Sequence, residues 1–264
     1  MGILNATPDS FHSESRVTVA TAVDTARRMA EEGADIIDIG AQSTRPGAET
    51  VGAAREWDRL QPVLEGVRAA LPHLPLSVDT FHAAVAQQAI QSGADMVNDI
   101  SAGTMDPEMG NVVAASGVPY AIMHMQGTPR TMQDQPQYAN VVDEVKAFLE
   151  GRLAWAADLG IQHLMVDPGF GFGKRLSDNY ALLNALSALR VLGVPILAGV
   201  SRKSMIYKAL GSTPEQALNG TSCCHAWALD RGAHVLRVHD VAPAVECIAL
   251  HQYLRGAEPE PQHD

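Results

Sequence analysis

Short apolar runs alternate along the chain with longer amphipathic stretches. Eight runs predict strands, and they read GILNAT, ADIIDIG, LSVDT, DMVNDI, YAIMHM, HLMVDPG, ILAGVSRKS and HVLRVHD. Between them, stretches such as VATAVDTARRMAEEGA and VVDEVKAFLEGRLAWAADLG repeat apolar residues with helical spacing. Strands that alternate with helices predict a parallel sheet with helical crossovers. Eight such units without a linker predict an α/β fold with one domain, a (β/α)8 or TIM barrel over residues 1–255.

Each predicted strand ends in polar residues that are capable of chemistry. They are Asn5, Asp38, Gly40, Asp79, Asn98, Asp99, His124, Asp167, the segment from Ser201 to Ser204, Arg237 and His239. In such a barrel the carboxyl ends of the strands and the loops after them form the active face. A structural alternative exists for each residue, because an inward Asp or Asn can be buried and bonded to loop backbone. It is a poor explanation for all eight strand ends together.

Composition excludes several classes of protein. The net charge is −11 and no block of Lys and Arg occurs, which argues against nucleic-acid or anionic-membrane partners. No apolar run approaches the ~18 residues of a membrane span. Three cysteines without metal-ligand spacing, and no visible targeting signal, predict a soluble protein of the reducing cytoplasm. The polar, proline-containing residues 256–264 predict a disordered tail.

Asp79, Asn98 and Asp167 are expected to converge inside the barrel mouth. Two carboxylates and a carboxamide on rigid strands suit a planar heterocycle with amino and ring N–H groups. The same oxygens could instead hold Mg²⁺. We favour heterocycle recognition.

A second set of residues predicts an anion site. The segment Ser201-Arg202-Lys203-Ser204 follows a strand and opens a helix, so backbone N–H groups, the helix dipole and Lys203 attract negative charge. Arg237 and His239 are two residues apart on one strand and point to the same side. The alternative is that Arg202 or Arg237 only neutralises barrel aspartates.

Three loops are expected to shape the substrate site. The stretches TPDSFHSESR and AQSTRPGAETVG are long for βα connections and are expected to close over substrate. In DPGFGFGK, Gly169, Gly171 and Gly173 permit tight turns that aim Phe170 or Phe172 into a site.

The strings GILNATPDSF, STRPGAE, SVDT, NDIS, MHMQGTP, DPGFGFGK, SRKS, NGTS and RVHD resemble, in this order, the dihydropteroate synthase family of folate biosynthesis. The resemblance runs from Met1 to about Arg255. It implies condensation of 6-hydroxymethyl-7,8-dihydropterin diphosphate with 4-aminobenzoate, giving dihydropteroate and diphosphate with Mg²⁺. It also implies a transferase that is a sulfonamide target.

The resemblance further implies a role for each site residue. Asn5 contributes to the Mg²⁺ and diphosphate site, and the catalytic residues are Asp79, Asp167, Lys203 and Arg237. The pterin diphosphate is bound by Thr44, Asp79, Asn98, Asp167, Lys203, Arg237, Val238 and His239, with the Arg237 plane stacked on the pterin. The 4-aminobenzoate pocket is formed by Phe11, Thr44, Pro46, Phe172 and Ser204.

Two segments depart from the family pattern. After Phe11 the family commonly continues Ser-Asp-Gly-Gly, whereas this chain has His12-Ser13-Glu14-Ser15, and we hypothesise that Glu14 supplies the missing carboxylate. If it does, Glu14→Ala lowers turnover or Mg²⁺ dependence; unchanged values would contradict the hypothesis. Ala41-Gln42 also replaces the usual Gly-Glu.

Two rival functions stay open. A pterin-binding methyltransferase domain would need no diphosphate site, so Lys203 and the Arg237-Val238-His239 run argue against it. A catalytically silent pterin-binding protein is plausible only because of the altered first loop. The family is usually a homodimer, and the small-residue stretch 221–228 is expected to serve either its interface or a core helix.

Overall fold

The computed structural model describes residues 1–6, 19–42 and 51–256. The strands are β1 (Gly2–Asn5), β2 (Ile37–Gly40), β3 (Leu76–Asp79), β4 (Met96–Asp99), β5 (Tyr120–Met123), β6 (Leu164–Asp167), β7 (Leu197–Ala198) and β8 (Val235–Leu236). The helices are α1 (Val19–Glu31), α2 (Ala53–Ala70), α3 (Ala83–Gln91), α4 (Met109–Ser116), α5 (Val141–Asp158), α6 (Leu176–Asn184), α7 (Ser204–Tyr207), α8 (Leu218–Asp230) and α9 (Val241–Leu254), with a 3-10 helix η2 (Leu186–Leu192). Strands and helices alternate as predicted.

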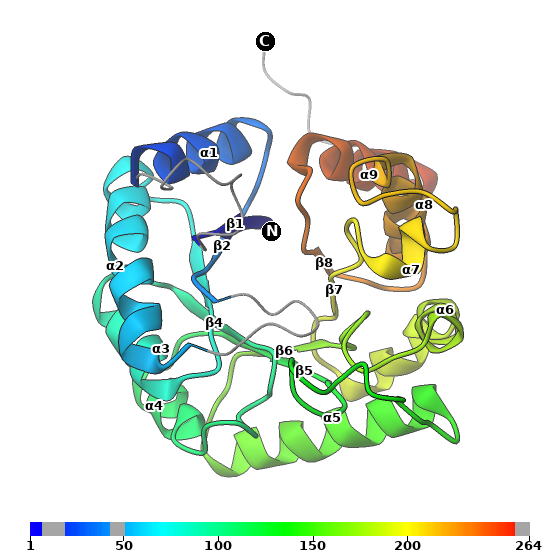
Figure 1. The fold of residues 1–264 in the computed structure, drawn as a ribbon, viewed down its shortest axis with the longest axis horizontal. Coiled ribbons are helices and arrows are strands. Elements are labelled where there is room, and N and C mark those ends of the chain that lie inside the picture. The colour runs from blue at the N-terminus through cyan, green and yellow to red at the C-terminus, as the bar shows by residue number, and fades with distance from the viewer. Residues whose placement is uncertain (7–18, 43–50, 257–264) are drawn as a thin grey trace.

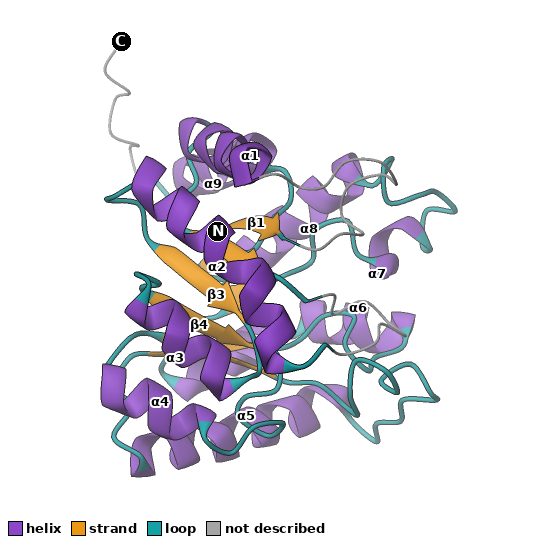
Figure 2. Cartoon of the chain, turned by 60° about the vertical axis from the view of Figure 1, so that its left-hand side comes forward, coloured by secondary structure: helices purple, strands orange, loops and turns teal. Residues whose placement is uncertain are grey.

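The strands close into a barrel. β1 to β6 pair in sequence order as parallel neighbours, and β7 pairs with β8. The Val166 amide donates to Pro195 O at 2.9 Å and joins β6 to β7. The Ile3 amide donates to Val238 O, and the Val238 amide to Met1 O, both at 2.9 Å, which joins β8 to β1. Helices surround the ring of strands (Figures 1 and 2), so the predicted (β/α)8 barrel is confirmed.

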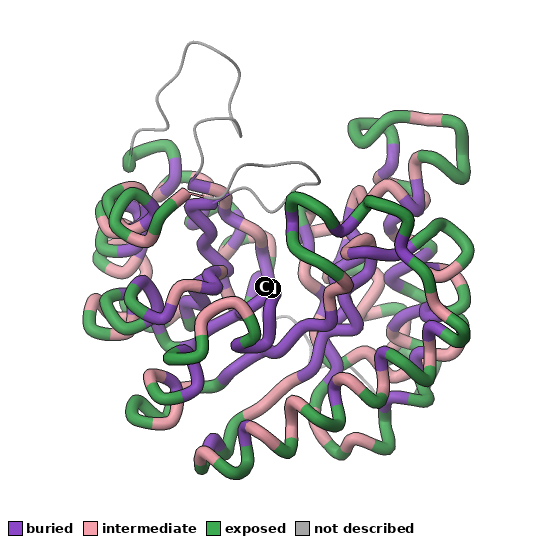
Figure 3. Tube along the Cα trace, turned by 60° about the horizontal axis from the view of Figure 1, so that its bottom comes forward, coloured by how far each residue is buried: buried purple, intermediate pink, exposed green. Residues whose placement is uncertain are grey.

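The pleat of the strands separates two interiors. Leu76 and Val78 of β3 belong to the large core between strands and helices, whereas Ser77 and Asp79 alternate with them and face the barrel axis. A smaller cluster fills the amino-terminal part of the barrel and comprises Met1, Met96, Ala121 and Leu197. Figure 3 shows buried residues along the strands and on the inner sides of the helices. The apolar filling therefore supports the polar strand ends from below.

The structure describes some of the features predicted outside the barrel core, but not the C-terminal tail. No helix in residues 1–6, 19–42 and 51–256 is long and apolar enough to cross a membrane. The predicted disordered tail lies outside the described residues from position 257 onward. In α8, Thr221, Cys224, His225 and Ala228 are buried, so this side of the stretch belongs to the core.

Two glycines in helices provide a matched test of packing. A Cβ on Gly110 in α4 would lie 2.4 Å from Leu159 Cδ1 and 2.5 Å from Trp155 Cζ2. Gly151 in α5 has nothing within 4 Å of the same position. Close helix contact therefore requires a glycine at position 110 but not at position 151.

We predict opposite effects of alanine at these positions. Gly110→Ala should lower the free energy of unfolding by about 1–3 kcal/mol, because overpacking outweighs the gain in helix propensity. Gly151→Ala should raise it by about 0.5–1 kcal/mol. Urea denaturation of both variants measures the difference, and a Gly110→Ala protein as stable as the parent would contradict the packing argument.

Candidate active site

A guanidinium that crosses the barrel connects three strands. Arg237 follows β8, and its Nε donates to Asp38 Oδ2 at 2.6 Å while its Nη2 donates to Asp79 Oδ2 at 2.6 Å. Asn98 at the end of β4 donates from Nδ2 to the same Asp38 oxygen at 3.0 Å. Arg237, Asp79 and Asn98, which the sequence predicted as site residues, therefore lie in one hydrogen-bonded network.

Burial sets the charge balance of this network. Burial raises the pKa of Asp79, and the nearby Arg237 opposes that rise. Burial disfavours the charge of Arg237, but Asp38 and Asp79 raise the pKa of the guanidinium above its ordinary value. Arg237 therefore stays charged and is held between two carboxylates.

Asp167 and Lys203 form the second half of the site. Asp167 Oδ1 accepts the Gly169 amide at 2.7 Å, and Lys203 Nζ donates to Phe170 O at 2.5 Å. A Cβ on Gly199 would lie 3.7 Å from both Asp167 Oδ2 and Lys203 Nζ and 3.9 Å from Arg237 Cβ. Gly199 thus lies beside the charged groups of Asp167 and Lys203 and beside the first side-chain carbon of Arg237. The expected convergence of Asp79, Asn98 and Asp167 thus takes the form of two clusters. Asp79 and Asn98 belong to the Arg237 network, Asp167 belongs with Lys203, and the two clusters adjoin at Gly199.

Burial also acts on the second cluster. It raises the pKa of Asp167, against the attraction of Lys203. It lowers the pKa of Lys203 to about 8, against the attraction of Asp167. A bound ligand that forms hydrogen bonds with Asp167 and Lys203 would compensate for the solvation that these two groups lose on burial.

The glycine turn after β6 lies directly on the end of β5. Gly169 has φ 70°, and a Cβ there would lie 1.9 Å from His124 O. Gly173 has φ 60°, and a Cβ there would lie 2.5 Å from Gln126 O. No other residue could occupy either position without moving the backbone. The turn places the Phe172 ring 4.7 Å from Lys203 Nζ, so of the two predicted phenylalanines Phe172 faces the site.

A buried lysine holds this turn in place. Lys174 Nζ donates to Gly169 O at 2.9 Å and to Phe172 O at 3.1 Å, and lies 2.9 Å from His124 Nδ1. Burial lowers the pKa of His124 to about 3, so its imidazole is neutral and Nδ1 can accept. Lys174 is 3% exposed and binds protein groups, which distinguishes its role from that of Lys203.

The predicted anion-binding residues lie around the start of α7. Ser204 begins this helix, and Ser201 Oγ lies 3.1 Å from both the backbone N and Nδ1 of His239. Burial, then Arg237, lowers the pKa of His239 to about 4, so the ring is neutral. Val238 has a buried side chain, and its amide and carbonyl both bond to β1.

The two arginines that could neutralise aspartates behave differently. Arg237 bonds to two carboxylates inside the barrel, as that alternative proposed. Arg202 instead forms a fork with Asp240, from Nε to Oδ2 at 2.7 Å and from Nη2 to Oδ1 at 2.9 Å. It therefore ties the β7–α7 turn to the start of α9.

The first two loops are described only at their edges. Asn5 ends β1 beside Gly40 of β2 and is half-buried. Phe11, Thr44, Pro46 and the altered segment 12–15 lie outside the described residues. At the edge of the second loop, Gln42 Oε1 accepts the Val51 amide at 3.2 Å.

Three structurally important polar residues were given no role in the predicted site, although Asp38 was named among the strand-end residues. Asp38 closes a predicted strand, but only the register shows that Arg237 and Asn98 meet it. Lys174 gives no sign in the sequence of being buried. Glu56 is fully buried in the first turn of α2, and its Oε2 lies 2.6 Å from Nδ1 of His82, which precedes α3.

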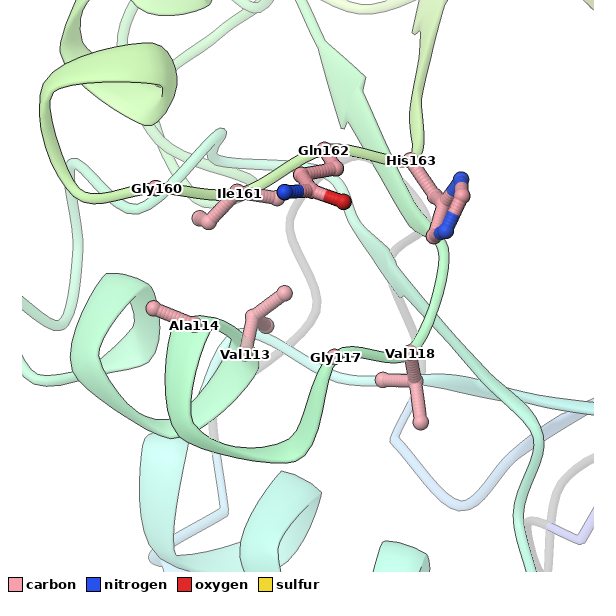
Figure 4. Close-up of a pocket in the computed structure, with 8 residues that line it drawn as sticks. All are labelled: Val113, Ala114, Gly117, Val118, Gly160, Ile161, Gln162 and His163. Carbon is pink, nitrogen blue, oxygen red and sulfur yellow. The ribbon is translucent and has the colours of Figure 1, made fainter.

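A cavity of about 240 Å³ lies at the opposite end of the barrel (Figure 4). Val113 and Gly117 from the end of α4, together with Gln162 and His163 before β6, form part of its lining. None of the charged residues of the two clusters lines it. Its size therefore does not mark it as the active site, which is defined by the strand ends.

Comparison with known proteins identifies the family of this chain. Residues 1–239 match the family described as pterin binding enzyme. The chain belongs to this family of pterin-binding enzymes.

The similar proteins within the family share one activity. Over 247 residues the chain is 44% identical to the dihydropteroate synthase of Synechocystis sp., covering 91% of this chain and 84% of that protein. It resembles the structure of Xanthomonas albilineans dihydropteroate synthase with 4-aminobenzoic acid, with a TM-score of 0.89, 45% identity and coverage of 97% and 93%. The same enzyme in complex with 7,8-dihydropteroate gives a TM-score of 0.86, 42% identity and coverage of 97% and 93%.

The Glu56–His82 pair generates a pH-dependent prediction. The hydrogen bond to Glu56 raises the pKa of His82 in the folded protein. The stabilisation is therefore fully present below the unfolded value of about 6.5 and is lost as pH rises through the folded value. His82→Gln should lower the free energy of unfolding more at about pH 6 than at about pH 9.

Urea denaturation at both pH values measures this difference. His73→Gln, at an exposed position, is the matched control and should have a small effect at either pH. An equal cost of His82→Gln at both pH values would contradict a charged pair.

Proposed function

We propose that the chain is a dihydropteroate synthase. It condenses 6-hydroxymethyl-7,8-dihydropterin diphosphate with 4-aminobenzoate and releases 7,8-dihydropteroate and diphosphate. The observation that carries this proposal is that Arg237 is held by Asp79 beside Asn98, Asp167 and Lys203 in one barrel mouth. The similarity to dihydropteroate synthases over nearly the whole chain supports it.

The pterin is assigned to the buried polar groups. The carboxylate of Asp167 would accept from amino and ring N–H groups, and Asp79 and Asn98 would bind the ring from β3 and β4. Lys203 would donate to a ring acceptor, and the Arg237 plane would stack on the pterin. Buried polar groups of this kind favour a heterocycle that pairs them all.

The diphosphate is assigned to Arg237, Val238 and His239. Arg237 supplies the positive charge, and neutral His239 can donate one hydrogen bond to an oxygen. The amide and carbonyl of Val238 are used in barrel closure, which limits it to shaping the site.

Mg²⁺ is proposed at Asn5. The donor chemistry fits, because a half-buried carboxamide oxygen at the rim is a hard ligand and Mg²⁺ commonly binds one or two protein oxygens together with substrate phosphates. Among the described residues no group of three His, Cys, Asp or Glu could hold a metal without such help. When bound, the ion would neutralise charge on the diphosphate.

The 4-aminobenzoate is assigned to the rim around α7. Its carboxylate would meet the backbone N–H groups at Ser204, and Phe172 would cover the ring. Phe11, Thr44 and Pro46 complete the predicted pocket from the first two loops, which lie outside the described residues.

The reaction is a displacement at the pterin methylene with strong SN1 character. The C–O bond to diphosphate breaks and its electron pair leaves with the diphosphate, whose charge Arg237 stabilises. Asp79 and Asp167 stabilise the cationic pterin. The aniline nitrogen then attacks the methylene carbon and loses a proton, so no residue acts as a nucleophile.

We also assign the protein to the cytoplasm as a homodimer. The exposed large apolar residues include several on η2, α8 and α9, namely Val191, Trp227, Leu250, Tyr253 and Leu254. Such residues suit contact with a second copy of the chain. The exposed side of α8 thus favours the interface, while its other side belongs to the core.

Dimerisation predicts a concentration-independent mass of two chains in analytical ultracentrifugation. Trp227→Asp should shift the protein to a monomer, because a charge would be buried without a partner. Leu176→Asp, at an exposed leucine of α6, is the control and should stay dimeric. A monomeric parent protein would contradict the assignment.

The pterin assignment predicts a specific binding defect. Asp167→Asn should weaken pterin binding by about 2–5 kcal/mol, because ring donors lose a charged acceptor. Calorimetry measures the change. Asp158→Asn, at an exposed carboxylate at the end of α5, should bind normally, and unchanged affinity of Asp167→Asn would remove Asp167 from the pterin site.

An assay of diphosphate release tests the whole function against its rivals. With pterin diphosphate and Mg²⁺, release that requires 4-aminobenzoate is the expected result. Tight pterin binding without turnover would support the silent pterin-binding protein, and the methyltransferase domain would show neither release nor need for a diphosphate.

A further inference from the structure

Asp38 lies one step deeper in the barrel than the predicted ligand-binding residues. In the strand register Gly40, Asp79 and Asn98 stand at one level, whereas Asp38 stands beside Ser77, which pairs with Met96 of the apolar cluster below. The Asp38 side chain is fully buried. A ligand in the barrel mouth would therefore meet Asp79 and Asn98 before Asp38.

The carboxylate of Asp38 binds two site residues through one oxygen. Oδ2 accepts Arg237 Nε at 2.6 Å and Asn98 Nδ2 at 3.0 Å. Oδ1 is buried and has no hydrogen-bond partner among the described residues. A buried carboxyl oxygen without a partner is costly, so stability alone does not explain an aspartate at this position.

The bond to Asn98 fixes which end of its carboxamide faces the ligand. The Nδ2 group donates to Asp38, and a flip of the amide would place two oxygens against each other. The bond therefore uses one donor of Nδ2 and leaves Oδ1 of Asn98 as the acceptor end of the carboxamide. A ligand with an N–H group at this point is favoured.

The bond to Arg237 fixes the plane of the guanidinium. Asp38 holds Nε and Asp79 holds Nη2, so two fixed acceptors prevent rotation of the fork. The described residues give Nη1 no hydrogen bond. Its donors are free for an anionic oxygen.

We propose that Asp38 is a positioning residue, which orients the Asn98 carboxamide as an acceptor for the pterin and the Arg237 guanidinium for the diphosphate. This inference rests on the proposed function. Asp38 touches neither substrate and acts through two residues that do.

A charge swap between positions 38 and 98 tests the orientation of Asn98. Asn98→Asp should weaken binding of 6-hydroxymethylpterin by about 100-fold, because two buried carboxylates would face each other. The double variant Asp38→Asn with Asn98→Asp restores a donor–acceptor pair of opposite direction. It should regain at least about tenfold in affinity by calorimetry. A double variant no better than Asn98→Asp would overturn the inference.

Steady-state kinetics test the orientation of Arg237. Asp38→Asn should lower kcat for pterin diphosphate by about 10–100-fold, because the guanidinium acts on charge that develops as diphosphate leaves. Ser77→Ala is the matched control, since Ser77 faces inward beside Asp38 and is fully buried. It should stay within about twofold of the parent. Parental kcat and pterin affinity in Asp38→Asn would overturn the inference.

Stability measurements cover the case in which variants at position 38 do not fold. Asn98→Asp should then be less stable in urea than Asn98→Ala, and equal stability would overturn the contact with Asp38. The parent protein separates the two proposals. Absence of pterin binding by the parent would overturn the proposed function, whereas normal binding without rescue by the swap would overturn only the role of Asp38.

Discussion

The site depends on where the barrel closes. The amide and carbonyl of Val238 bond to β1, and this closure carries the neighbouring Arg237 across the barrel to Asp38 and Asp79. Because β1 lies between β8 and β2, an open sheet would separate the guanidinium from both carboxylates. The ion pairs in turn compensate charges that burial would otherwise make costly. Closure of the fold and assembly of the site are thus one structural event.

The glycine turn after β6 has a different role. It brings the Phe172 ring and the Phe170 carbonyl to Lys203. Gly169 and Gly173 allow the turn to lie on the end of β5, and Lys174 binds the carbonyls of Gly169 and Phe172. Lys203 contacts Phe170 O and the Phe172 ring. The two lysines have similar chemistry but different partners. Lys174 binds protein carbonyls, whereas the ammonium group of Lys203 lies beside Gly199, as does the carboxylate of Asp167.

The sequence predicted the barrel and most of the described site because both follow from local patterns. Short apolar runs between helical stretches predicted the strands, and parallel order brought Asp79, Asn98 and Asp167 to one rim. The pairing of Arg237 with Asp38 depends on register between strands 199 residues apart along the chain, which no local pattern contains. Burial of Lys174 and Glu56 likewise depends on loop packing. The ligand-binding roles of the site residues, Asn5 and Ser204 among them, remain predictions, since they concern Mg²⁺ and the substrates.

The distribution of charge explains how one barrel mouth could stabilise both the pterin cation and the diphosphate that the proposed reaction would form. Burial raises the pKa of Asp79 and of Asp167, so positive charge beside either group stabilises its carboxylate form, and Arg237 beside neutral His239 presents positive charge to an anion. Under the proposed function, breaking the C–O bond creates a cationic pterin and a more negative diphosphate. Each charge forms next to a group of opposite sign that is already in place, so little reorganisation is needed. The same argument gives Asp38 a part below them. Arg237 already donates to Asp79, and without the Asp38 carboxylate the guanidinium would be held at one end only and could turn away from the anion.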